Sequence, residues 1–227
     1  KEMGRFRHEA VAFDIDNGHV YQTEDREDGL FYRFIPNVLN DLSKGGKLQG
    51  LSLKKYRGPN TSNWKSDIFK VGDIHEVRWI DLNNVESPDD DLRLRGKNKG
   101  CATFTRGEGV WYADDYVYFT CTNGGKEKLG QIWRYRKDAY DDSSGYLELF
   151  YESKDKETLN MPDNITVSPW GDLILSEDGK GYDRLVGVKT DGTTYLLAEN
   201  QLNKSEFAGA VFSPDGKTLF VNIYKPT

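Results

Sequence analysis

Four acidic residues occupy the same position in four similar stretches of the chain. Each precedes a short apolar run, a tight turn and a second short run, and the four are Glu9, Glu108, Asp163 and Glu206. Carboxylates that gather in a partly dry site repel one another and take up protons unless a cation relieves the repulsion. Calcium suits such a site because it accepts about six to eight oxygen ligands at flexible angles. The repetition therefore predicts that the four acids bind metal together, and the alternative is that each caps its own turn or pairs with a local lysine.

Arg106 stands two residues before one of these acids, in the sequence Arg106-Gly-Glu108-Gly. Its guanidinium offers paired donors that match the oxygens of phosphate or carboxylate. Beside a cluster of acids and metals, it would complete a site for an oxyanion. We therefore predict that Arg106 is a catalytic residue that contacts the substrate. The competing interpretation is that Arg106 only neutralises a neighbouring acid.

The elements that must position these residues also repeat. The four stretches cover residues 8–25, 107–123, 162–178 and 205–222. Each is predicted to form two strands joined by a turn, and two further strand-like runs follow each of the first three. Four short antiparallel strands per repeat are typical of the blades of a β-propeller. We predict an all-β fold with about three and a half four-stranded blades, and a β-sandwich is the structural alternative.

Residues 54–100 interrupt this repeat and are interpreted as an insertion between blades, with one strand predicted at 75–82. A propeller closes with roughly four to eight blades. Residues 1–227 are therefore expected to form a partial propeller domain whose N-terminal blades lie elsewhere.

The composition fits this fold and argues against some partners. Aromatic residues make up 13% of the chain and 23 residues are glycine, which favours strands and turns. The formal net charge of −6, without a basic stripe, argues against a nucleic-acid partner. No apolar run approaches the roughly 20 residues that a membrane span needs. Cys101 and Cys121 are predicted to be free buried thiols, although a disulfide between them is not decided by sequence.

An ordered set of motifs resembles the PhoX-type alkaline phosphatases. The motifs are GRFRHEA, RGEGVWY, GQIWRY, PDNITVSP and SEFAGAVFSPDG. The resemblance implies a six-bladed propeller, located in the periplasm or secreted, whose calcium and iron cluster hydrolyses phosphate monoesters.

The same resemblance implies roles for individual residues. Glu9 in the His-Glu motif, Glu108 and Asp163 would be metal ligands, and Arg106 would contact the substrate phosphate. The assignment of Glu206 as a metal ligand rests mainly on its position in the repeat. Better-studied members read Arg-Pro-Glu-Asp where this chain has Arg106-Gly-Glu108-Gly. They also take an iron-ligating cysteine from a Cys-Glu-Glu motif, which these 227 residues do not contain.

The favoured hypothesis is a metal-dependent hydrolase of phosphate monoesters, an alkaline phosphatase with Ca²⁺ and with Fe³⁺ as a second candidate metal. We expect a monomer with a small phosphorylated substrate; whether these residues suffice for activity stays open. One alternative is a calcium-dependent lactonase, and another is a non-catalytic propeller whose calcium is structural. Arg106 separates these hypotheses, because a neutral lactone has little need of a guanidinium.

Overall fold

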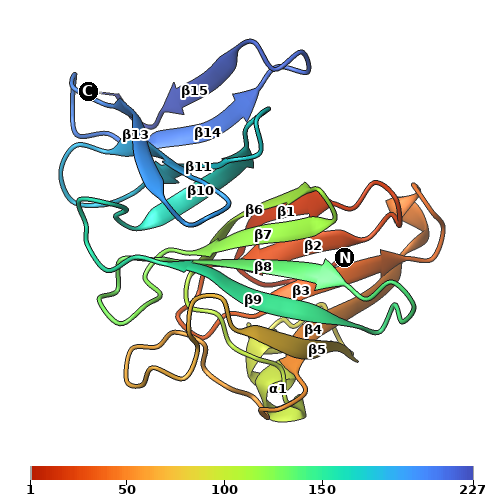
Figure 1. The fold of residues 1–227 in the computed structure, drawn as a ribbon. Helices are drawn as coiled ribbons and strands as arrows, with labels where there is room; N and C mark the ends of the chain where they lie inside the picture. Colours follow the sequence, from red (N-terminus) through yellow and green to blue (C-terminus); the bar gives the residue numbers. More distant parts are fainter. Residues whose placement is uncertain (1, 227) are drawn as a thin grey trace.

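The computed structural model describes residues 2–226, whose regular elements are almost all antiparallel strands (Figure 1). The first blade contains β1 (His8–Phe13), β2 (Val20–Glu24), β3 (Phe31–Pro36) and β4 (Gly46–Leu53). The second contains β6 (Gly107–Ala113), β7 (Tyr116–Cys121), β8 (Gln131–Lys137) and β9 (Ser144–Glu152). The third contains β10 (Pro162–Val167), β11 (Leu173–Glu177), β12 (Arg184–Val188) and β13 (Thr194–Glu199), and β14 (Phe207–Phe212) pairs with β15 (Leu219–Ile223). The prediction of an all-β propeller fold with about three and a half blades is confirmed.

Short turns at one end of each blade make the inner strand pair possible. Asp114 and Asp115 both adopt positive φ angles, of 50° and 64°, as the two-residue turn between β6 and β7 requires. In the first blade, Asp14 Oδ1 accepts hydrogen bonds from the backbone N–H groups of Asp16 and Asn17. These aspartates are therefore used as turn formers, at the end of the strands opposite to the predicted site.

The segment between the first two blades joins them into one sheet. This segment contains β5 (Ile74–Asp81), whose bounds agree to within one residue with the strand predicted at 75–82. This strand pairs with β4 on one side and with β9 on the other, with Leu51 opposite Trp79 and Val77 opposite Gly145. The result is a nine-stranded sheet in the order β1-β2-β3-β4-β5-β9-β8-β7-β6.

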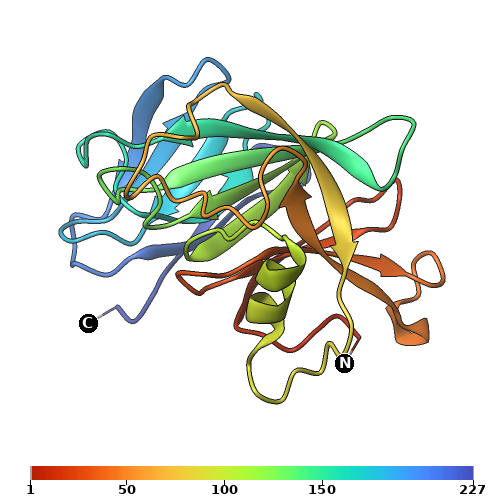
Figure 2. The ribbon, with the colours of Figure 1, turned by 90° about the horizontal axis from the view of Figure 1, so that it is seen from below.

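The same segment also supplies α1 (Leu92–Lys99), and β3 and β4 are joined through the short 3-10 helix η1 (Leu42–Lys44). Leu92 of α1 belongs to the same buried cluster as Phe34 and Leu48 of the first blade. The helix itself is the yellow-green coil in Figure 2. Within residues 2–226, no helix combines the length and the apolar character needed to cross a bilayer.

The core lies between neighbouring blades and is rich in aromatic side chains. Phe31 of the first blade stacks on Phe119 of the second, with ring centroids 4.1 Å apart. Trp79 donates from Nε1 to the Tyr135 hydroxyl across 3.0 Å, so this buried polar pair is satisfied. The strand aromatics therefore serve as inter-blade core. Both cysteines are free and buried, which confirms the thiol prediction.

Gly109 allows the inner strands of the second and third blades to approach closely. A Cβ atom at this position would lie 2.7 Å from the backbone nitrogen of Ile165 and 2.9 Å from the carbonyl oxygen of Asp163. Backbone atoms cannot swing aside as the end of a flexible side chain does. A glycine between Glu108 and the rest of β6 is therefore a packing requirement.

We expect Gly109→Ala to lower the free energy of unfolding by about 1–3 kcal/mol, because overpacking forces the two blades apart. Urea denaturation followed by tryptophan fluorescence would measure the loss. Gly107→Ala in the same strand is the matched control, since its nearest neighbour would be the Glu24 carbonyl oxygen at 3.3 Å. An equal or smaller loss for Gly109→Ala than for Gly107→Ala would contradict the close-approach argument.

Candidate metal site

Three of the four acids predicted to bind metal lie in β-bulges. The pairing register shifts between His8 and Val11 in β1, between Gly107 and Val110 in β6, and between Pro162 and Asn164 in β10. Glu9, Glu108 and Asp163 lie inside these shifts. A bulge breaks the strict alternation of side chains and re-aims one of them. The same irregularity at the start of three inner strands therefore turns three carboxylates out of the regular strand pattern.

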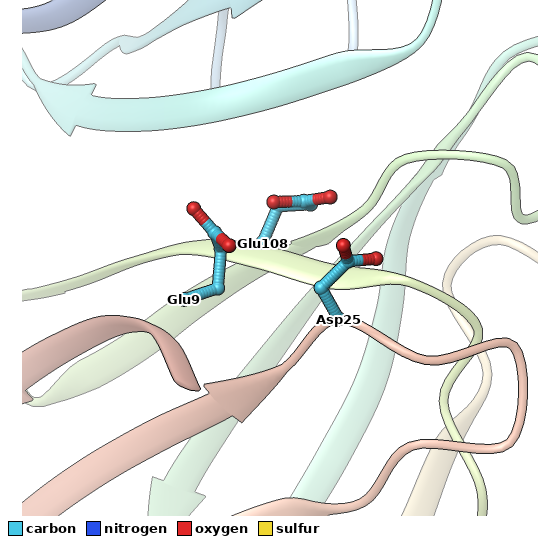
Figure 3. A group of neighbouring side chains, drawn as sticks. All are labelled: Glu9, Asp25 and Glu108. Atoms are coloured by element: carbon cyan, nitrogen blue, oxygen red, sulfur yellow. The ribbon is translucent and has the colours of Figure 1, made fainter. Parts of the chain in front are cut away.

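Glu9, Asp25 and Glu108 come together at one end of the nine-stranded sheet (Figure 3). Glu9 comes from β1, Glu108 from β6, and Asp25 directly follows β2. One carboxylate oxygen from each residue lies within 4.8 Å of the others. Two oxygens on opposite sides of one calcium ion are about 5 Å apart, so this group matches the span of a single hard cation. The donors are all oxygens, as such cations prefer.

The electrostatics of this group favour a bound cation. Burial first, and then the neighbouring charges of Asp163, Asp25 and Glu9, together raise the pKa of Glu108 to about 10, although Arg106 opposes them. The pKa of Glu9 is also raised, by burial first and then by Asp25. Without a cation, the site therefore holds protons that bound metal would displace.

Arg106 lies against two members of the group. Its Nε donates to Asp25 Oδ1 across 2.8 Å, and its Nη2 donates to Glu108 Oε1 across 2.5 Å. The residue has a positive φ of 47°, and its backbone is bonded on both sides, to the Arg26 carbonyl and to the Thr122 N–H. Arg106 therefore neutralises two acids in this structure, and its fork is held by Asp25 and Glu108.

Hydroxyl groups at the ends of the second strands hold the inner strand of the next blade. Thr23 at the end of β2 donates to the carbonyl oxygen of Glu108. Thr120 of β7 donates to the carbonyl oxygen of Asp163 across 3.0 Å. Each acid is thus fixed through its own backbone by the preceding blade.

Asp163 and Glu206 lie outside the group of three but are linked to it. Burial, followed by the charges of Asp178 and Glu9, raises the pKa of Asp163 to about 6. Burial, followed by the charges of Asp178 and Asp163, raises the pKa of Glu206 to about 7. Glu206 precedes β14 instead of lying in its bulge. The predicted acids therefore form a row of interacting carboxylates, the acidic row, that runs from Glu9 through Asp163 to Glu206.

Two residues next to this acidic row were not among the predicted ligands. Asp25 and Asp178 each directly follow the second strand of a blade, as the last residue of a Glu-Asp pair. That shared position was the signal that could have identified them. His8, although adjacent to Glu9, is exposed, stacks on Phe6 and bonds to the Gly4 carbonyl oxygen.

A cavity of about 540 Å³ lies elsewhere, at the turn end of the same strands. Its walls include Tyr112, Tyr135 and Asp138, and none of the clustered carboxylates. The candidate metal site is therefore separate from this cavity.

The metal-free protein should lose stability as the pH rises from about 5 to about 10. The folded-state pKa values of Glu108, Asp163 and Glu206 are all raised above their ordinary values. Folding therefore binds protons, and this contribution is complete below about pH 4 and is lost as the pH passes each folded-state value. Urea denaturation in a chelating buffer between pH 5 and pH 10 would measure the slope. Equal stability at pH 6 and pH 9 would contradict these shifts, and Glu108→Gln should flatten the slope.

Comparisons with known proteins bear on this site and this fold. A family model described as alkaline phosphatase PhoX matches residues 1–227. The solved structure of Pseudomonas fluorescens PhoX in complex with vanadate, a transition state analogue, is similar with a TM-score of 0.76 and 22% sequence identity. The match covers 99% of this chain and 50% of that one, so this chain spans about half the length of that relative. This likeness shows a shared fold.

Two other solved structures are more distant. A gluconolactonase from Xanthomonas campestris is 13% identical with a TM-score of 0.44, over 95% of this chain and 69% of that one. Virginiamycin B lyase from Staphylococcus aureus is 16% identical with a TM-score of 0.42, over 100% of this chain and 72% of that one. No curated protein matches the chain.

Proposed function

Because the chain belongs to the alkaline phosphatase PhoX family, we propose that it forms part of a metal-dependent site that hydrolyses phosphate monoesters. One observation carries this proposal: three carboxylate oxygens lie within 4.8 Å of one another, and the Arg106 guanidinium bridges two of the three residues. Cations and a forked donor at one place suit a tetrahedral oxyanion.

The formal charges indicate that more than one cation is needed. Glu9, Asp25, Glu108 and Asp163 carry −4 when ionised. Arg106 and Arg7, whose Nη2 lies 3.0 Å from Asp25 Oδ2, carry +2, so the net charge is −2. A phosphate dianion would bring the total to −4. Two divalent cations, or one divalent and one trivalent cation, offset this charge to within one unit.

We assign Glu9, Asp25, Glu108 and Asp163 as metal ligands, with Glu206 at the far end of the acidic row. The oxygen donor set suits Ca²⁺, and Fe³⁺ is the second metal to be tested. When bound, the cations would neutralise the phosphate and polarise the scissile P–O bond.

The residues of the chain itself orient the substrate. Arg106 is held by Asp25 and Glu108 in a fixed position, from which its remaining N–H donors are proposed to contact the non-bridging oxygens of the phosphate. Such preorganised donors act most strongly as charge develops in the transition state. The Thr23 hydroxyl, through the Glu108 carbonyl, keeps the Glu108 bulge in register with the first blade.

We also propose how much of the propeller these residues form and where the protein is located. Residues 1–227 are proposed to supply about half of a six-bladed propeller, with residues 54–100 as an insertion between blades, because the chain covers half of the Pseudomonas structure. Family membership also supports a periplasmic or secreted location and a small phosphorylated substrate.

The test is elemental analysis of the purified full-length protein, together with assays on a phosphate monoester and on a lactone. We expect at least two metal ions per chain, calcium among them, and turnover of the monoester alone. Metal without any turnover would indicate a structural site, and lactone turnover without phosphatase activity would indicate a lactonase. A full-length protein without bound metal would overturn the site.

A further inference from the structure

Asp25 is held by two arginines that differ in their surroundings. Arg106 reaches its Oδ1 from inside the site, where the Arg106 side chain is 28% exposed and also binds buried Glu108. Arg7 reaches its Oδ2 from the solvent side, and the Arg7 side chain is 59% exposed. The two guanidinium groups therefore bind different oxygens of the same carboxylate, Arg106 from inside the site and Arg7 from the solvent side.

The outer arginine is free to exchange partners at little cost. Water and salt screen the exposed Arg7 end of this ion pair, and buried Asp25 keeps its second ion pair with Arg106 when Arg7 turns away. The Arg106 guanidinium is bonded to two acids and the Arg106 backbone is hydrogen-bonded on both sides, so this arginine is held in its position. Arg7 precedes β1 and has no such second ion pair among residues 2–226. It can therefore turn from Asp25 toward an anion that arrives from solvent.

The position of Arg7 indicates which part of a substrate it would meet. A phosphate that contacts Arg106 and the clustered acids must lie inside the site, so the rest of the ester extends past the exposed residues Glu9 and Arg7. Glu9 repels an anion there unless it is bound to metal, whereas Arg7 attracts one.

We infer that Arg7 is a specificity residue that binds a second anionic group on the leaving-group side of the substrate. This inference rests on the proposed function. The preferred substrates are then phosphate monoesters that carry a second phosphate or a carboxylate near the ester, in preference to esters of neutral alcohols.

The test compares kcat/KM of the full-length protein for phenyl phosphate and for two matched esters, one with a carboxylate and one with a second phosphate on the ring. We expect wild type to prefer at least one anionic ester, and Arg7→Gln to reduce that preference by about 5–10-fold, mostly through KM. A gain with both esters indicates recognition of any anion, and a gain with the second phosphate alone indicates a dianion. Either result supports the inference.

Arg5→Gln is the matched control, because it removes the same charge from the same segment. Arg5 is exposed and lines a hollow with Phe6, His8 and Glu86, and Asp25 is not among the residues that line it. This variant should keep the wild-type preference.

A binding measurement provides a readout apart from turnover. Isothermal titration calorimetry of the metal-loaded protein should show that Arg7→Gln weakens the binding of methylenediphosphonate more than it weakens the binding of inorganic phosphate. Turnover of phenyl phosphate without a preference for the anionic esters, or a preference that Arg7→Gln leaves intact, overturns this inference alone. Absence of turnover and of phosphate binding in wild type overturns the proposed function as well.

Discussion

Glu108→Gln should remove most of the proposed metal binding and most of the proposed phosphatase activity together. Glu108 is 3% exposed, lies within reach of Glu9, Asp25 and Asp163, and accepts from Arg106. Glutamine keeps the volume of the side chain but cannot supply a charged oxygen. Loss of groups that only support a metal ligand typically costs about 10–100-fold, so loss of a ligand should lower kcat/KM by about 100-fold or more.

Elemental analysis and a phosphate-monoester assay on the same preparation would check this result. Glu148→Gln is the matched control, because Glu148 also pairs with an arginine, Arg134, but lies on β9 outside the acidic group. The control should retain metal and activity. Wild-type metal content and full activity in Glu108→Gln would refute the role of Glu108.

Arg106→Lys should lower kcat/KM for phosphate monoesters by about 100–1,000-fold while the protein still binds metal. Lysine retains the positive charge, but its N–H donors all sit on one nitrogen, so it cannot reproduce the rigid fork that reaches Asp25 from Nε and Glu108 from Nη2 and leaves further donors for a phosphate oxygen. A single preorganised donor at a developing oxyanion is worth about this factor.

The measurement is steady-state kinetics with phosphate as a competitive inhibitor, whose affinity should also fall. Arg134→Lys on β8 is the control, since it makes the same change in an arginine that pairs with Glu148. Unchanged kinetics in Arg106→Lys would show that Arg106 serves only to neutralise its neighbours.

The fold was largely predictable because its signals are local and repeated. Aspartates and glycines mark the turns, aromatic and β-branched runs mark the strands, and the order of these signals recurs in each blade. The role of β5 was not predictable in the same way. Its residues indicate a strand, but nothing in residues 74–81 shows that both edges pair, one with β4 and one with β9.

The site was predictable only in part, because its geometry depends on departures from regular pairing. The acids at the starts of the inner strands were visible as a repeat, but the bulges that re-aim Glu9 and Glu108 are shifts of register. Asp25 shows the limit most clearly. Its neighbour Glu24 points the other way, accepting from the Leu30 N–H and the Tyr32 hydroxyl, and a one-residue alternation decides which of the two joins the site.

The double pairing of β5 has a consequence for how the molecule opens. Glu9 and Glu108 lie in the nine-stranded sheet and Asp25 directly follows its strand β2, whereas Asp163 lies in a second sheet and Glu206 directly precedes the first strand of a third. Regions that share a continuous hydrogen-bond ladder tend to unfold as one cooperative unit. Amide protons of β1, β2 and β6 should therefore exchange at a common slow rate, and those of β14 and β15 faster. The three-carboxylate group would then persist through a fluctuation that opens the last strands of the chain.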